Sequence, residues 1–207
     1  MSTKNQAVEL EKVVIKFAGD SGDGMQLTGT QFTDTSALLG NDLATFPDFP
    51  AEIRAPQGTV PGVSGFQVHI GNTEINTPGD IADILVAMNP AALKANKKQI
   101  KKGGTIIVNI DSFEKRDLEK AGYEASPLED SSFEGFNIIE SPITSLTRES
   151  LKDSGLDGKS IGRSKNMFAL GIVYWLFNRP MESTESFLKK KFKSKPDVVN
   201  ANIKVLH

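Results

Sequence analysis

Cysteine is absent from the 207 residues. Its absence excludes disulfides, a cysteine nucleophile, a thiolate zinc site and an iron–sulfur cluster held by this chain alone. Only two histidines are present, His69 and His207, so a metal site built from several histidines is excluded as well. We predict no metal ligands here. Basic residues do not exceed acidic ones, 24 against 26, which argues against nucleic-acid binding through phosphate contacts.

Long apolar segments are also lacking. The longest apolar run, Met167 to Phe177, is too short to cross a bilayer. Residues 1–12 are polar and charged and do not contain the apolar core of a signal peptide. We therefore expect a cytoplasmic protein without membrane segments. Its 38% apolar and 24% charged residues are typical of a folded protein, and the length fits a single domain over residues 1–207.

The beginning of the chain predicts a strand, a tight loop and a helix. Residues 13–18 are an apolar run typical of a buried strand, and residues 19–24 contain three glycines. Residues 25–39 then carry apolar side chains at helical spacing. Asp23 is predicted to be the N-cap of this helix, with Gln26 three residues later completing a capping box.

The rest of the chain alternates predicted strands with predicted helices. Pro90 is suited to the start of a helix that Gly103 and Gly104 would end, and Ser164 and Ser183 are predicted to cap later helices. This alternation predicts a three-layer α/β/α, Rossmann-like fold with a doubly wound, mostly parallel sheet. The further strands are expected at residues 65–70, 84–88, 105–109 and 137–140, with a short one from residue 43, and the further helices at 90–102, 164–177 and from 183 onward.

The glycine loop, residues 19–24, is the strongest candidate for a binding site. Free backbone N–H groups at a helix start and the helix dipole attract phosphate, and glycine lets the backbone come close to a ligand. The spacing is G-x-x-G-x-G, which differs from the G-x-G-x-x-G of dinucleotide sites, and Asp20 and Asp23 add negative charge. A tight turn into a capped helix, without a ligand, is the alternative interpretation.

Two other segments carry charge near predicted loop or helix starts. Residues 46–56 contain three prolines, which favour an ordered irregular loop that reaches the same sheet edge as the glycine loop. Arg54 within it is either available to a phosphate or carboxylate, or simply solvated. Residues 160–166 bring Arg163 and Lys165 to a helix start, where they either attract an anion or lie exposed behind a plain N-cap.

Three motifs occur in order along nearly the whole chain. They are FAGDSGDGM at residues 17–25, FPDFPAEIRAP at 46–56 and SKNMFALG at 164–171, with Asn-Ile-Asp at 109–111 between the last two. Together they resemble the gamma domain of the 2-oxoacid:acceptor (ferredoxin) oxidoreductases. The similarity is greatest to the N-terminal part of the alpha subunit of 2-oxoglutarate-type enzymes. The resemblance implies that residues 1–207 are a gamma-type domain at the start of a longer alpha subunit, or a free-standing gamma subunit.

The resemblance also implies an activity and a division of labour. The family oxidatively decarboxylates a 2-oxoacid with coenzyme A to give an acyl-CoA, CO2 and reduced ferredoxin or a similar acceptor. Thiamine diphosphate, magnesium and iron–sulfur clusters are implied for the remaining alpha domain and the beta subunit, in agreement with the missing cysteines. Residues 22–24 match the first half of a thiamine diphosphate fingerprint, but its second half is missing. We expect no catalytic residue here, and an inactive isolated chain.

Coenzyme A binding is the part of this activity that the resemblance assigns to the domain. In related pyruvate enzymes the glycine loop meets the nucleotide end of coenzyme A, assisted by an asparagine on a late helix. Many gamma subunits have a G-x-G-G-Q-G type of loop, whereas this loop contains acidic residues. The contacts carried over to this chain are Asp20, Ser21, Gly22, Asp23, Gly24, Met25, Arg54 and Asn166.

Two other functions stay open at this point. A self-contained NAD(P)-dependent oxidoreductase would need the standard glycine spacing, an acidic residue that binds the ribose, and a catalytic set of Tyr, His or Lys. Of these three requirements the sequence offers only a candidate ribose-binding acid, Asp42. A ligand-free interaction domain would use its sheet edge as a subunit surface. Binding of coenzyme A discriminates between them.

Overall fold

A mixed six-stranded sheet forms the centre of the computed structural model, which describes residues 9–52 and 54–207. The strand order is β2-β3-β1-β4-β5-β6. Strands β1, β4, β5 and β6 are parallel, whereas β3 is antiparallel to both β1 and β2. This confirms the mostly parallel α/β sheet. The strands are β1 (Lys12–Asp20), β2 (Asp42–Asp48), β3 (Val63–Gly71), β4 (Ala82–Ala87), β5 (Ile100–Asn109) and β6 (Asn137–Ser141).

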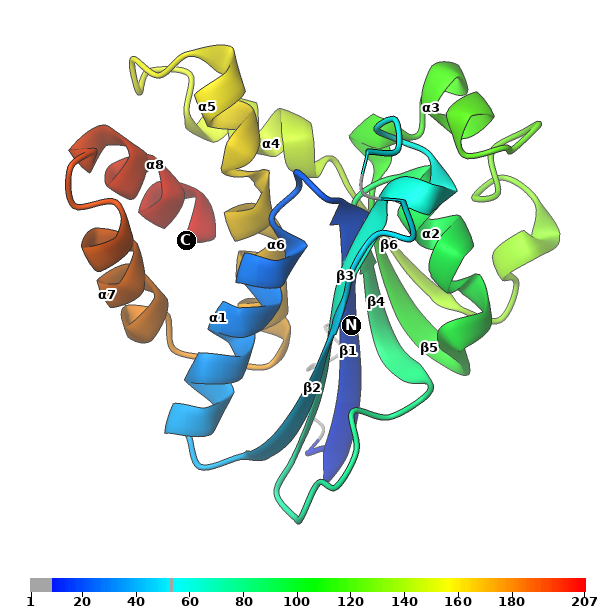
Figure 1. The fold of residues 1–207 in the computed structure, drawn as a ribbon, viewed down its shortest axis with the longest axis horizontal. Coiled ribbons are helices and arrows are strands. Elements are labelled where there is room, and N and C mark those ends of the chain that lie inside the picture. The colour runs from blue at the N-terminus through cyan, green and yellow to red at the C-terminus, as the bar shows by residue number, and fades with distance from the viewer. Residues whose placement is uncertain (1–8, 53) are drawn as a thin grey trace, which may run out of the picture.

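Helices cover both faces of the sheet (Figure 1). Helices α1 and α6 pack on one face with α7 and α8 outside them, and α2 and α3 lie on the other. The helices are α1 (Met25–Leu38), α2 (Pro90–Asn96), α3 (Lys115–Lys120), α4 (Ile143–Ser150), α5 (Gly158–Arg163), α6 (Lys165–Leu176), α7 (Glu182–Lys191) and α8 (Pro196–Leu206). Of these, α3, α4, α5 and α8 are not among the predicted helices. In the described part of the chain, no helix combines the length and apolar character needed to cross a membrane. The prediction that residues 1–12 contain no signal peptide falls mostly on residues 1–8, which lie outside the described residues.

The predicted helix 90–102 is wrong in its second half. Helix α2 ends at Asn96, and β5 already begins at Ile100, which is buried. Gly103 has φ +75° inside β5, where the pairing with β4 shifts register, so the glycine pair makes a bulge instead of ending a helix. Glycine adopts a positive φ both at helix C-termini and in strand bulges, so the Gly-Gly pair alone does not tell which of the two structures forms.

Two predicted caps also differ from the structure. Ser164 occupies the N-cap position of α6, but its side chain makes no capping hydrogen bond, because its backbone continues the helical conformation of α5. Helix α7 begins at Glu182 after Met181, so Ser183 lies inside the helix.

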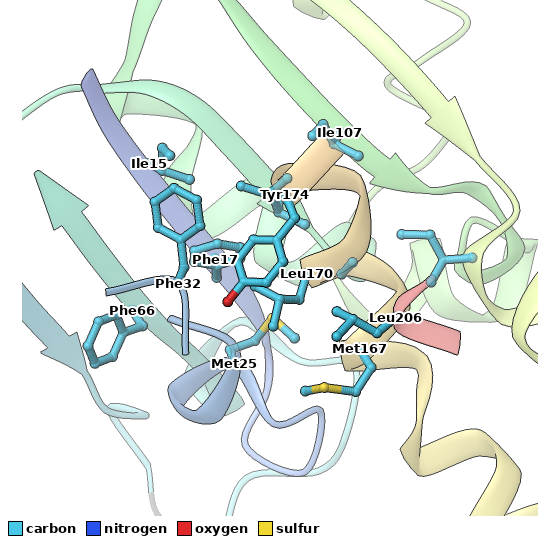
Figure 2. Close-up of a cluster of buried hydrophobic side chains, with 14 of the residues drawn as sticks. Ile15, Phe17, Met25, Phe32, Phe66, Ile107, Met167, Leu170, Tyr174 and Leu206 are labelled. Atoms are coloured by element: carbon cyan, nitrogen blue, oxygen red, sulfur yellow. The ribbon is translucent and has the colours of Figure 1, made fainter. Parts of the chain in front are cut away.

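The main core joins α1, α6 and α7 to the sheet. Phe32 of α1 packs between Phe17 of β1 and Tyr174 of α6, with ring centroids 6.1 Å apart in each pair, and Figure 2 shows the three rings together. The buried Tyr174 hydroxyl donates to the carbonyl of Gln31 at 2.9 Å and is hydrogen-bonded to the Thr184 hydroxyl at 2.7 Å. This packing fixes α1 and α6 relative to each other, and so positions the loops that precede them.

Candidate binding site at the carboxyl ends of the strands

The carboxyl ends of β1, β4 and β5 meet at one edge of the sheet, where polar side chains organise the loops. Asn89, two residues after the end of β4, caps α2 by accepting from the backbone N–H of Ala92 at 2.8 Å. Asn109, at the end of β5, donates to the Met88 carbonyl at 3.3 Å and to the Thr144 hydroxyl at 3.0 Å. The glycine loop after β1 therefore lies beside two loops that Asn89 and Asn109 fix by hydrogen bonds. This is the edge of the sheet where parallel α/β proteins bind ligands.

The carboxylate of Asp23 holds the glycine loop together. One of its oxygens accepts from the backbone N–H of Asp20 at 3.1 Å, and the other pairs with Lys165 Nζ at 2.8 Å. The predicted N-cap role of Asp23 is therefore wrong. The N-cap is Gly24 with φ 77°, and no side chain caps the helix. Gln26 is not part of a capping box, because its amide donates to the Gly65 carbonyl at 2.6 Å.

The chain directly after the proline-containing segment 46–56 reaches the glycine loop. The backbone N–H of Gly58 donates to both carboxylate oxygens of Asp20, each at 3.1 Å. Arg54 is exposed and is not among the residues that line the cavity beside this loop. The contact with the glycine loop is thus made two residues beyond the predicted segment 46–56, and Arg54 is not brought to the loop.

Asp20 is held in a partly buried position. Burial raises the pKa of its carboxyl, the hydrogen bond from Gly58 lowers it, and repulsion from Asp23 raises it, with a net upward shift. The raised pKa means that the folded protein binds this proton more tightly than the unfolded chain does.

We expect Asp20→Asn to change how stability depends on pH. The folded-state pKa of Asp20 is raised, so the wild type should gain stability relative to Asp20→Asn as the pH falls from 7, with the gain complete below the unfolded value of about 3.9. Asparagine keeps an oxygen to accept from Gly58. Urea unfolding of both proteins at pH 7 and pH 4 measures this difference, and an identical difference at both pH values would contradict the assignment.

The starts of α1 and α6 meet at Gly24 and Asn166. A Cβ added to Gly24 would lie 2.5 Å from Asn166 Nδ2, so only glycine allows this approach. Asn166 is 6% exposed, and its Oδ1 is buried without a hydrogen-bond partner among the described residues. An unpaired buried acceptor is costly. Two helix N-termini and one free acceptor therefore converge at this point, a combination suited to a ligand with both anionic and donor groups.

The other predicted loop residues differ in exposure. Ser21 and Gly22 are exposed. The side chain of Met25 is 1% exposed and belongs to the core, as Figure 2 shows, so only its backbone can face a ligand. Among the described residues, no group of three His, Cys, Asp or Glu side chains is placed to hold a metal ion.

A cavity of about 150 Å³ lies beside the glycine loop. Several of its residues were not predicted as site residues, although the Asn-Pro pair after the β4 strand was a usable signal. Lys165 was weighed only as a basic residue at a helix start, and its pairing with Asp23 could not be foreseen. The lining residues are Asp20, Asp23, Gln57, Gly58, Met88, Asn89, Ser112, Asp117, Lys120 and Lys165.

The sequence matches one protein family over residues 14–207, described as pyruvate ferredoxin/flavodoxin oxidoreductase. It is 52% identical, over 95% of its length, to the 2-oxoglutarate oxidoreductase subunit KorA of Mycobacterium tuberculosis. The chain spans 30% of the length of that relative.

Two solved structures have similar folds. One is the 2-oxoglutarate:ferredoxin oxidoreductase of Magnetococcus marinus with 2-oxoglutarate, coenzyme A and succinyl-CoA bound, at TM-score 0.71 and 28% identity, covering 96% of this chain and 30% of that chain. The other is a keto/oxoacid ferredoxin oxidoreductase gamma subunit from Geobacter sulfurreducens, at TM-score 0.61 and 19% identity, covering 94% of this chain and 96% of that subunit. The second likeness concerns the fold alone.

Proposed function

Because the chain belongs to the pyruvate ferredoxin/flavodoxin oxidoreductase family, we propose that residues 1–207 are the gamma-type domain of a 2-oxoglutarate:ferredoxin oxidoreductase. In this proposal the domain helps to bind coenzyme A and contacts the remaining alpha domain and the beta subunit. The whole enzyme converts a 2-oxoacid and coenzyme A to acyl-CoA and CO2, and passes two electrons to ferredoxin or a similar acceptor. The 52% identity to a 2-oxoglutarate enzyme subunit supports this choice of substrate.

The observation that carries the coenzyme A site is the meeting of Gly24 and Asn166. Coenzyme A carries phosphate groups together with adenine and amide donors. The starts of α1 and α6 attract phosphate, and the unpaired Oδ1 of Asn166 needs a donor. The Magnetococcus marinus enzyme, which has a similar fold, contains bound coenzyme A.

The acidic residues of the loop do not oppose this role. Asp20 is bound by the Gly58 N–H, and Asp23 is paired with Lys165. Both carboxylates thus act as positioning groups that shape the loop, and the proposal assigns the phosphate contacts to the backbone from Ser21 to Met25. Arg54 is exposed on the adjoining segment, and we propose it as a further cation that contacts coenzyme A.

The chain's own part in the reaction is to bind and orient coenzyme A. Thiamine diphosphate with magnesium and iron–sulfur clusters, held by the remaining alpha domain and the beta subunit, would supply the carbon and electron chemistry. This chain has no cysteine for such clusters, and we assign it no catalytic residue. A cytoplasmic location remains a prediction.

Coenzyme A titration of the intact enzyme tests the proposal. We expect Asn166→Ala to weaken coenzyme A binding about tenfold, the equivalent of one lost hydrogen bond, with the KM for 2-oxoglutarate unchanged. Asn202→Ala is the matched control, because Asn202 is a similarly buried helix asparagine on α8 whose amide bonds to Val198. Equal affinity in Asn166→Ala and the control, or binding of NAD(P)H in place of coenzyme A, would contradict the proposal.

A further inference from the structure

A surface cavity of about 280 Å³ lies at the end of the sheet opposite to the glycine loop. Its walls come from the start of β1, the end of β3, the turn between α1 and β2, and the end of α6. Figure 1 shows the turn between α1 and β2 at the bottom of the view. A water molecule takes about 30 Å³, so the cavity has room for a small organic molecule. We call it the Arg179 cavity, and its apolar side chains are Leu10, Val13, Ile70, Leu176 and Phe177.

Arg179 brings a positive charge to this cavity without a carboxylate to balance it. Among the described residues, its Nε is buried and has no hydrogen-bond partner, and neither aspartate nor glutamate lines the cavity. Burial lowers the pKa of the guanidinium, although an arginine side chain stays charged in a protein. A cation that is partly removed from water is stabilised by an anion beside it. The Arg179 cavity is therefore suited to an anionic ligand.

Asn41 lines the same cavity and has an unused acceptor. Its Nδ2 donates to Asn72 Oδ1 at 3.1 Å and to the Gly71 carbonyl at 3.4 Å. These two acceptors fix the orientation of the amide, which leaves Oδ1 buried without a hydrogen-bond partner in the described part of the chain. A buried acceptor without a partner is costly. The ligand of this cavity should therefore carry a hydrogen-bond donor as well as a negative charge.

We propose that the Arg179 cavity binds a small 2-hydroxy monocarboxylic acid with an apolar tail. The carboxylate pairs with the guanidinium of Arg179, whose planar N–H groups match it, and the 2-hydroxyl donates to Asn41 Oδ1. The tail packs on the apolar side chains of the cavity. An ammonium in place of the hydroxyl is disfavoured, because it would lie beside Arg179 without an acidic residue to balance it. This site lies apart from the glycine loop and does not depend on the proposed function.

Calorimetric titration of the intact enzyme with 2-hydroxy-4-methylpentanoate tests the proposal. Pre-incubation with 2-oxoglutarate occupies any site for the 2-oxoacid substrate, so that the remaining binding belongs to another site. We expect the hydroxy acid to bind about tenfold more tightly than its uncharged amide, and about fivefold more tightly than 4-methylpentanoate, which lacks the hydroxyl. No binding of the hydroxy acid, or equal binding of the acid and its amide, would overturn the proposal.

A pair of variants locates the binding. Arg179→Gln should bind the hydroxy acid about tenfold more weakly than the wild type and should not distinguish the acid from its amide, because glutamine carries no charge. Arg148→Gln is the matched control and should keep the wild-type affinity, since Arg148 is exposed on α4 and does not line the cavity. Arg179 is only partly buried, so both variants should fold, which circular dichroism verifies. Wild-type affinity in Arg179→Gln would show that the acid binds elsewhere, and would overturn the proposal.

Discussion

Gly29→Ala should lower the free energy of unfolding by about 3 kcal/mol, because α1 crosses the sheet where there is no room for a methyl group. A Cβ at Gly29 would lie 2.7 Å from the Cβ of Phe66 on β3 and even closer to its ring. Phe66 is 8% exposed and packed in the main core, so the ring has no free space to enter. The helix itself must move away from the sheet. Urea denaturation gives this free energy directly.

Gly162→Ala is the control for the helix propensity of alanine. Gly162 lies in α5, and a Cβ there would meet no atom within 4 Å. Alanine is the better helix former by about 1 kcal/mol, so this variant should be as stable as the wild type or slightly more stable. A Gly29→Ala protein as stable as Gly162→Ala would show that α1 does not pack as closely on β3 as the structure indicates.

Gly24→Ala should weaken coenzyme A binding about thirtyfold, which corresponds to about 2 kcal/mol. Two effects combine at this position. The left-handed φ of 77° disfavours any side chain, and the new Cβ would lie 2.5 Å from Asn166 Nδ2. Because Asn166 is buried at the start of α6, it must move out of its position, and the loop backbone shifts with it. Calorimetric titration of coenzyme A into the intact enzyme measures the loss.

Gly40→Ala separates the two effects of the Gly24 substitution. Gly40 has a similar φ of 84°, but a Cβ there would meet no atom within 4 Å. The Gly40→Ala substitution should lower the free energy of unfolding by about 1 kcal/mol through backbone strain alone. It should leave the affinity for coenzyme A unchanged. If Gly24→Ala bound coenzyme A as tightly as Gly40→Ala, the contact between Gly24 and Asn166 would have no role in binding.

Local patterns were sufficient for much of the fold and for the family. The apolar run at residues 13–18, the glycine loop and the helix after it are local features, and each lies where it was predicted. The motifs at residues 17–25, 46–56 and 164–171 also predicted the family correctly. Helices α3, α4 and α5 are only six to eight residues long, so tertiary packing stabilises them more than their own sequence does. Helix α8, by contrast, begins with Pro196 and carries apolar residues at helical spacing, so it was missed although its signal was present.

Roles that depend on a distant partner were mispredicted or missed. Asp23 has the right residue type and position for an N-cap, but its carboxylate instead binds Asp20 and Lys165. Gly103 has the residue type of a helix stop, but it lies in a strand bulge. In each case a local preference fitted two structures equally well, and a long-range contact decided between them.

The sequence by itself determined the α/β class, the absence of cysteine ligands and the family, because these depend on composition and on short motifs within the chain. Tertiary structure alone decided that Asn166 meets Gly24, 142 positions earlier in the chain, and that Gly58 binds Asp20. It also decided that Trp175 is exposed to solvent, although the apolar helix that carries it packs in the core of the protein. Residues far apart in sequence come together only when helices pack on a sheet, and that packing minimises exposed apolar surface over the whole chain at once.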